Sequence, residues 1–235
     1  SVAGNFKREE MLALLNHYFG RWQAKAPYAP LETKASYHQS WIQKKKDVEQ
    51  LHTCIAFEGL EREHPLKYAM AIFNTVFGGG MSSRLFQKIR EEQGLTYSIY
   101  SYTTAFADTG LFSIYASMNP SQAEAVYKGI AAEIAAVRKE GISEKILNVT
   151  KEQMISNFII GSESTLNRMT AAGSAMLLRG KVQEMEEVIE KIEAVTQKDL
   201  AEVAELIFAN PKMSYSAVGN LKGVDFANTV EKLFS

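Results

Sequence analysis

The stretch GGGMSSRLFQKIREEQGLTYSIYSY, residues 78–102, contains the features that decide the fold of this protein. Three glycines end one apolar segment, and the residues after them have the spacing of apolar side chains that predicts an amphipathic helix. Gly94 ends this helix, and the aromatic and β-branched residues that follow are typical of a strand. The stretch therefore predicts a helix that carries Arg90 and a strand that carries Tyr97, seven residues further on.

The flanking segments predict a domain of the α+β class. Two strand-like runs, residues 36–47 and 48–60, come first, and a hairpin of residues 95–106 with 109–118 surrounds the break Ala-Asp-Thr-Gly. Helix-start signals lie near His64, Asn119, Ser143, Ser164, Glu184 and Thr196, and MSYSAVG is the last strand. This order favours an antiparallel-rich sheet covered mainly on one face by helices. It disfavours a doubly wound nucleotide-binding fold, in which strands and helices alternate.

The composition argues against nucleic-acid and membrane binding. The formal net charge is −1, and the one local basic run, residues 44–46, has acidic neighbours, as a solvated turn does. No run of eighteen apolar residues and no signal-peptide pattern is present. The single cysteine, Cys54, lies in an apolar run and is predicted to be a buried core residue, which fits a reducing compartment. We therefore expect a cytoplasmic protein whose partners are neither nucleic acids nor membranes.

The two ends of the sequence are similar to each other. At an offset of 215 residues, Gly4 matches Gly219 and Asn5 matches Asn220, and each end predicts a strand, a Gly-Asn turn and an amphipathic helix. A repeat of this kind changes the interpretation of the whole chain. It predicts the tail of a preceding homologous half in residues 1–20, a linker with two prolines in residues 21–35, and a C-terminal half-domain in residues 36–235.

The sequence lacks the local patterns of common catalytic sites. No two of the four histidines, His17, His38, His52 and His64, stand one helical turn apart, so neither H-E-x-x-H nor its inverse is present. His38 and His52 fall on neighbouring predicted strands and could meet, although a hydrogen-bonded or exposed histidine is the more common case. No G-x-S-x-G elbow occurs, and the glycine run lacks the lysine of a phosphate-binding loop. This chain alone is therefore predicted to bind no metal and to lack a self-sufficient catalytic set.

Three ordered motifs carry a resemblance to a known family. FGGGMSSRLFQKIREEQGLTYSIYSY, DTGLFSIYA and AAVRKEGISEKILNVTKEQM resemble the second-half domain of the insulinase-type or pitrilysin-type (M16) zinc metallopeptidases. Within that family, the motifs resemble those of bacterial processing-protease-like members and of mitochondrial processing peptidase. The resemblance covers about residues 38–220 and implies a half-domain with ferredoxin-like elements, one of two homologous halves.

The resemblance also implies a division of labour between the halves. In this family the first half holds zinc through H-x-x-E-H and a later glutamate, and the second half supplies an arginine and a tyrosine that reach the substrate. Those two positions match Arg90 and Tyr97, which are therefore the expected catalytic and substrate-binding residues. We expect zinc as a cofactor of the intact protein but not on this chain. The expected partners are its own N-terminal half and a peptide or unfolded polypeptide, and a homo-oligomer is left open.

The chemistry of Arg90 and Tyr97 suits this role in a metalloendopeptidase. Hydrolysis of a peptide bond builds negative charge on the carbonyl oxygen, and donors fixed near that oxygen stabilise the transition state by about 3–4 kcal/mol. Tyr97 offers a phenolic O–H, and Arg90 offers a permanently charged guanidinium.

Two other interpretations stay open. A non-catalytic partner or structural subunit of the same family would keep the fold and act by recognition, and a stand-alone peptide-binding domain would have no second half. The presence of both Arg90 and Tyr97 favours the enzyme over a structural relative. The strand-like start SVAGN disfavours a stand-alone domain, because a natural start rarely leaves a strand unpaired.

The remaining residues of the opening stretch have a structural interpretation. Gly78, Gly79 and Gly80 are expected to let the backbone fit closely. Met81, Phe86 and the aromatic residues between 97 and 106 are expected in the core more often than in a pocket, since large apolar side chains are most often buried, and the alternative that some of them line the cleft stays open.

Overall fold

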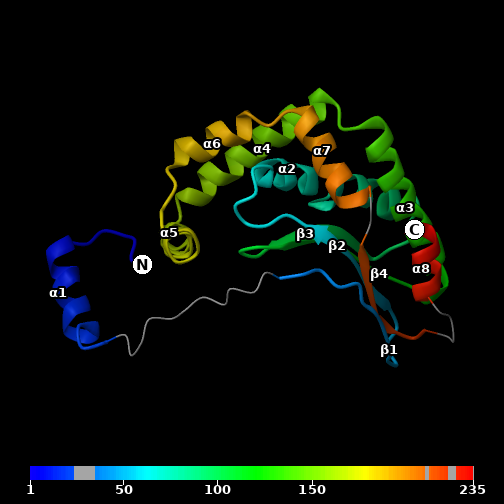
Figure 1. Ribbon diagram of the computed structural model, residues 1–235, viewed down its shortest axis with the longest axis horizontal. Coiled ribbons are helices and arrows are strands. Elements are labelled where there is room, and N and C mark those ends of the chain that lie inside the picture. The colour runs from blue at the N-terminus through cyan, green and yellow to red at the C-terminus, as the bar shows by residue number, and fades with distance from the viewer. Residues whose placement is uncertain (24–34, 210–211, 222–225, 235) are drawn as a thin grey trace. The chain divides into compact units, whose positions relative to one another are not determined.

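The computed structural model describes residues 1–23, 35–209, 212–221 and 226–234. The chain divides into two compact units, one from Ser1–Lys34 and Ser156–Glu184 and the other from Ala35–Ile155 and Met185–Ser235 (Figure 1). Each unit is described by itself. Most of the predicted linker, residues 21–35, lies outside the described residues.

The larger unit is built on a five-stranded mixed sheet. Its strands are β1 (Trp41–Lys45), β2 (Leu51–Gly59), β3 (Ser98–Ala105), β4 (Gly110–Met118) and β5 (Met213–Gly219), in the spatial order β1-β5-β2-β4-β3. The β1–β5 pair is parallel and the other three pairs are antiparallel. The predicted antiparallel-rich sheet and its β3–β4 hairpin are therefore confirmed. The two strands that come first in sequence are not partners, because β5 inserts between them.

Helices cover one face of this sheet (Figure 1). They are α2 (Lys67–Gly78), the π-helical turn η1 (Phe86–Glu91), the 3₁₀ turn η2 (Pro120–Gln122), α3 (Ala123–Glu140), the first part of α4 (Glu144–Ser162), α6 (Met185–Glu193), α7 (Gln197–Phe208) and α8 (Phe226–Phe234). Strand β2 alternates between buried and more exposed residues, as expected when one face of a sheet is covered. Thr196 and Asp199 form the predicted capping box at the start of α7.

The core under these helices is a cluster of phenylalanines from four elements. Phe73 and Phe77 of α2 have stacked rings, with centroids 5.6 Å apart, and both contact Phe112 of β4 and Phe208 of α7. Phe57 of β2 meets Phe208 edge to face at 5.1 Å. These contacts fasten α2 and α7 to the middle of the sheet and so fix where α2 ends.

The other face of the sheet is only partly covered, and this corrects two expectations. The aromatic residues between 97 and 106, together with Met81, are exposed and do not belong to the core: Met81, Tyr97, Tyr100, Tyr102 and Phe106. Cys54 is half-buried and lies on the less covered face, where its Sγ is 3.7 Å from the Tyr102 hydroxyl. A strand pattern identifies two faces but does not identify which one a helix will cover.

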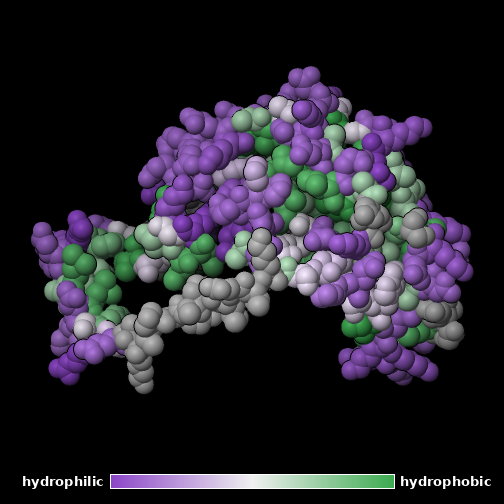
Figure 2. Space-filling view, in the orientation of Figure 1, coloured by the Kyte–Doolittle hydropathy of each residue, from purple (hydrophilic) through white to green (hydrophobic). Residues whose placement is uncertain are grey.

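The smaller unit consists of α1 (Arg8–Phe19), α5 (Thr165–Arg179) and the second part of α4. The predicted helix start near Ser164 is confirmed, and the Ser164 side chain caps this helix by accepting a hydrogen bond from the Asn167 backbone. Neither α1 nor α5 buries a residue, and hydrophobic side chains lie at the surface over α1 (Figure 2). None of the described helices has both the length and the apolar character that crossing a membrane requires.

Candidate functional site

The glycine run brings the end of helix α2 against strand β3. A Cβ atom at Gly78 would lie 2.4 Å from the backbone nitrogen of Ser101, so only glycine fits without a shift of backbone. Ser101 also donates a hydrogen bond from its hydroxyl to Asn74 Oδ1 at 2.8 Å. This buried contact holds α2 and β3 at a fixed separation, and it agrees with the structural role expected for Gly78.

Arg90 lies on a π-helical turn rather than on a regular α-helix. Glu92 N–H donates to the carbonyl of Gln87, five residues back, at 2.9 Å, and the Gln87 side chain donates to Met81 O at 2.7 Å. Such turns are rare and often occur at functional sites. The guanidinium carbon of Arg90 lies 4.7 Å from the ring centroid of Phe86, so the ring supports the charged group.

A left-handed glycine carries the chain from this turn into the sheet. Gly94 has a φ of +62°, and its N–H donates to Arg90 O at 3.0 Å, as at many helix ends. Leu95 N–H donates to Ile89 O at 3.1 Å, and Tyr97 N–H then pairs with Ser117 O of β4 at 2.9 Å. The backbone of Tyr97 is thus fixed by the sheet, directly before β3 begins.

The two predicted site residues come together at this point. The Arg90 guanidinium carbon is 6.0 Å from the centroid of the Tyr97 ring, and Tyr97 is 69% exposed. A contact of this kind stabilises an exposed pair by only about 0.5–1 kcal/mol. The arrangement therefore leaves the phenolic hydroxyl and the guanidinium available to a ligand.

A shallow hollow of about 300 Å³ lies beside the pair. Its lining comprises the glycines of 78–80, Met81, Phe86, Arg90 and residues 98–101 of β3. Strand β3 is the outer strand of the sheet, and β4 is its only partner strand among the described residues. Backbone groups along an outer strand can pair with an extended peptide.

The charges around the hollow leave Arg90 without a carboxylate partner within the part of the chain that the structure describes. The neighbouring cations are paired elsewhere, Arg84 with Glu133 of α3 at 2.9 Å and Lys88 with Glu92 at 2.7 Å. The Arg84–Glu133 pair is mostly shielded from solvent and ties the start of the turn to α3. Arg90 therefore carries the positive charge that a ligand in the hollow would meet.

Two buried hydroxyls near the site were not among the predicted site residues, although Ser83 was a candidate cap for the helix that follows the glycines. Ser83, before η1, and Thr96, next to Tyr97, are buried, and their hydroxyl oxygens have no hydrogen-bond partner among the described residues. No sequence signal distinguishes them from ordinary helix-start and strand residues. Phe86 was expected in the core, whereas it lines the hollow and supports Arg90.

The described residues do not fit a zinc site. No three His, Cys, Asp or Glu side chains gather there in a way that could hold a metal ion. His38 shares a hydrogen bond with Ser36 at 2.8 Å and His52 with Tyr115 at 2.7 Å, so each ring has its own neighbour. The functional groups that remain at the site are the Tyr97 hydroxyl and the Arg90 guanidinium, next to the start of strand β3.

Comparisons with known proteins agree with this architecture. Residues 1–154 match the family model described as the peptidase M16 inactive domain. An uncharacterized zinc protease of Bacillus subtilis is 36% identical over 208 residues, which is 88% of this chain and 50% of the relative. An uncharacterized zinc protease of Streptomyces coelicolor is 37% identical over 177 residues, or 75% of this chain and 38% of the relative.

Solved structures share the fold. A peptidase M16 inactive domain from Pseudomonas fluorescens superposes with a TM-score of 0.80 at 22% identity, over 92% of this chain and 52% of that chain. A protease from Helicobacter pylori gives 0.81 at 20% identity, over 92% and 53%. This chain thus spans about half the length of the relatives it matches. By the family match and by these relatives, the chain belongs to the peptidase M16 family, in which it represents the inactive domain of zinc protease-like proteins.

Proposed function

We propose that this domain supplies Arg90 and Tyr97 to a peptide that is hydrolysed between two homologous halves of an M16 metalloendopeptidase. The observation that carries the proposal is that the Arg90 guanidinium, which has no carboxylate partner among the described residues, lines the hollow and lies 6.0 Å from the exposed ring of Tyr97. Residues that hold zinc would lie in the N-terminal half of the intact protein. The naming of the relatives as zinc proteases supports that assignment.

The hydroxyl and the guanidinium would act on the carbonyl of the scissile bond. As negative charge builds on the carbonyl oxygen, the Tyr97 O–H donates to it and the Arg90 charge stabilises it. Neither group needs a change of protonation for this role. The outer edge of β3 would hold the backbone of the peptide in register with both side chains.

The test uses the two-half protein, that is, the polypeptide in which this chain follows its N-terminal half. Tyr97→Phe and Arg90→Ala are each expected to lower kcat/KM for peptide cleavage by about 100-fold or more, because removing one such donor costs about 3–4 kcal/mol. The matched control is Tyr102→Phe, an exposed tyrosine of strand β3, whereas the rings that the Arg90 guanidinium contacts are those of Phe86 and Tyr97. Circular dichroism should report the same fold for all variants.

Unchanged kcat/KM in both site variants would remove Arg90 and Tyr97 from the mechanism. The 235-residue chain alone is expected to bind no stoichiometric zinc and to cleave no peptide, as measured by elemental analysis and a fluorogenic assay. Zinc at one ion per chain together with cleavage would contradict the assignment of the metal to the other half.

A second candidate is a non-catalytic partner subunit that recognises the substrate. The description of the matching family model as an inactive domain favours it. In this case the two-half protein would bind peptides without cleaving them. Tyr97→Phe and Arg90→Ala would then weaken binding in a titration, with no turnover in any variant.

A further inference from the structure

Helices α1 and α8 follow segments that match in sequence and in backbone conformation. SVAGN of residues 1–5 corresponds to SAVGN of residues 216–220. Gly4 has a φ of +139° and Gly219 a φ of +153°, both in the region that favours glycine. The similarity of the two ends is therefore conformational as well as sequential.

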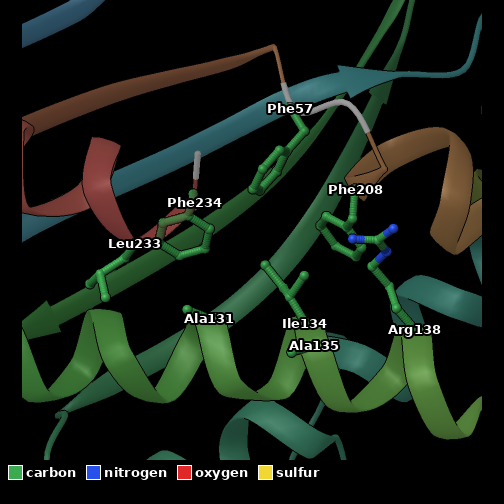
Figure 3. Close-up of a pocket in the computed structure, with 8 residues that line it drawn as sticks. All are labelled: Phe57, Ala131, Ile134, Ala135, Arg138, Phe208, Leu233 and Phe234. Carbon is green, nitrogen blue, oxygen red and sulfur yellow. The ribbon is translucent and has the colours of Figure 1, made fainter.

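Helix α8 uses one stripe of side chains to pack on its own domain. Phe226, Val230 and Phe234 are buried, and the helix contacts α3, β1 and β5. The ring centroids of Phe226 and Tyr127, and those of Phe234 and Phe57, are 6.2 Å apart. Figure 3 shows Phe234 beside Phe57 and above helix α3, at the wall of a small hollow of about 170 Å³.

Helix α1 carries the same stripe, but the described residues bury none of it, although the Phe19 ring meets the Trp22 ring edge to face at 5.1 Å. At the offset of 215 residues, Phe226, Val230 and Phe234 correspond to Met11, Leu15 and Phe19, all of them apolar. Leu15 is 37% and Phe19 is 49% exposed, whereas Val230 is 0% and Phe234 is 9% exposed. Ser1 donates a hydrogen bond to Met169 O within the smaller unit, but this exposed polar contact buries none of the three.

Gly219 is closely packed, whereas Gly4 packs against none of the described residues. At Gly219 a Cβ atom would meet Gln50 O at 2.7 Å and Leu51 Cα at 2.9 Å, so the glycine admits the backbone of the neighbouring strand β2. At Gly4 nothing among the described residues lies within 4 Å of a Cβ atom. Gly4 thus has a backbone conformation like that of Gly219. Among the described residues, the space that a neighbouring strand would occupy beside Gly4 is empty.

We infer that Met11, Leu15 and Phe19 form a docking surface for the homologous half-domain that precedes this one. Residues 2–5 add a strand to the sheet of that half, and α1 packs on the sheet and on a helix equivalent to α3. The repeat offset of 215 residues and the coverage of about half of each relative give that partner a size equal to one domain. The inference does not depend on Arg90 or Tyr97.

Hydrogen exchange of α1 and α8 in the same chain provides the test. A helix of twelve residues that packs on no other element has only marginal stability in water. In the 235-residue chain, residues 8–19 are expected to exchange at least ~100-fold faster than residues 226–234, because local opening without packing costs little. In the two-half protein both segments should be protected. Equal protection of both helices in the 235-residue chain at every concentration would overturn the inference.

Matched substitutions give a second readout. In the 235-residue chain, Leu15→Ala should leave the unfolding midpoint unchanged, whereas Val230→Ala, at the equivalent buried position, should lower it by about 4 °C or more. In the two-half protein both substitutions should lower a midpoint. An unchanged midpoint for Leu15→Ala in the two-half protein would contradict the docking surface.

A second copy of the same chain is the competing occupant. If α1 becomes protected only at high concentration in the 235-residue chain, and Leu15→Asp abolishes both that protection and a dimer detected by light scattering, the surface belongs to a second copy. That result would overturn the assignment to the preceding half-domain.

Discussion

The covered face of the sheet and the outer edge at β3 use aromatic side chains in opposite ways. Under the helices, Phe73, Phe77 and Phe112 are fully buried and contact one another. They stabilise the fold because they remove apolar surface from water. At the edge, Tyr97 is exposed and its ring lies 6.0 Å from the Arg90 guanidinium, so its hydroxyl is available to a ligand. The buried phenylalanines therefore stabilise the fold, whereas the fold holds Tyr97 at the surface, where a ligand can reach it.

The largest expected difference between the two regions is in stability. Phe73→Ala is expected to lower the free energy of unfolding by about 3–5 kcal/mol, because it removes a buried ring and leaves a cavity. Tyr100→Ala, on the less covered side of β3, should cost only about 1 kcal/mol, because its ring is partly exposed and pairs across the strands with Tyr115 at 4.9 Å. Chemical denaturation of the 235-residue chain measures both. Similar losses for the two variants would mean that the β3 surface is covered in the folded chain.

The buried tyrosine pair under the helices should make the covered face sensitive to alkali. Burial raises the pKa of Tyr127 to about 12, although its hydrogen bond with Tyr215 lowers that pKa. An unfolded tyrosine ionises near pH 10, so the contribution to stability is complete below pH 10 and is lost as the pH rises through about 12. The loss amounts to about 3 kcal/mol.

Denaturation midpoints between pH 9 and pH 12 test this expectation. Tyr127→Phe should flatten the alkaline fall in stability, and it should cost about 1 kcal/mol at neutral pH by removing the hydrogen bond to Tyr215. The exposed Tyr18→Phe is the control and should keep the fall of the parent chain. An alkaline fall that survives in Tyr127→Phe would assign it to other groups.

Gly78 lies where the covered face meets the site, and a substitution there should affect both. Gly78→Ala is expected to cost about 1–3 kcal/mol of stability, because its Cβ would strike the Ser101 backbone. In the two-half protein it should also lower peptide cleavage by moving β3 relative to Arg90. Gly80→Ala is the matched control, since nothing among the described residues lies within 4 Å of a Cβ there. Equal behaviour of the two variants would show that the close approach of α2 and β3 is unimportant.

The smallest expected effect concerns the cap of α7, which packs on the covered face. Hydrogen bonds from the backbone and side chain of Thr196 lower the pKa of Asp199. The carboxylate therefore stabilises the fold above the usual aspartate pKa near 4, and this contribution is lost as the pH falls through the lowered value. Because the group is mostly solvent-exposed, Asp199→Asn should cost about 1 kcal/mol or less at pH 7.

Acid denaturation curves compare Asp199→Asn with Asp47→Asn, which changes an acid on a surface loop. The first variant should have a smaller stability difference between pH 7 and pH 3 than the parent chain, and the second should match the parent. Identical curves for both variants would mean that the capping box does not contribute to acid stability.

The element pattern was predictable because it depends on neighbours in sequence. The capping signals at Ser164 and Thr196 and the β3–β4 hairpin are confirmed. The insertion of β5 between β1 and β2 was not predictable, since it pairs segments about 170 residues apart, and no local signal encodes such a pairing. The exposure of Tyr100 and Tyr102 was wrongly predicted for a related reason, because alternation does not say which face the helices cover.

The candidate site, too, was only partly predictable from the sequence. The spacing of Arg90 and Tyr97 was visible in the sequence, and their catalytic and substrate-binding roles stay a prediction. Their approach to 6.0 Å depends on the π-helical turn, the left-handed Gly94 and the pairing of Tyr97 with β4. The sequence could not show that the hydroxyls of Ser83 and Thr96 are buried without a hydrogen-bond partner among the described residues, because burial depends on the folded chain.

Local patterns in the sequence were enough to place the helices and strands, because side-chain periodicity, capping and glycine freedom act over a few residues. The similarity of the two ends was also visible in the sequence, whereas Arg90 and Tyr97 were expected from the resemblance to the M16 family. The tertiary structure alone decided the strand order, the covered face and the meeting of Arg90 with Tyr97. The physical reason is that burial and long-range pairing depend on the whole packed chain, and no short segment contains that information.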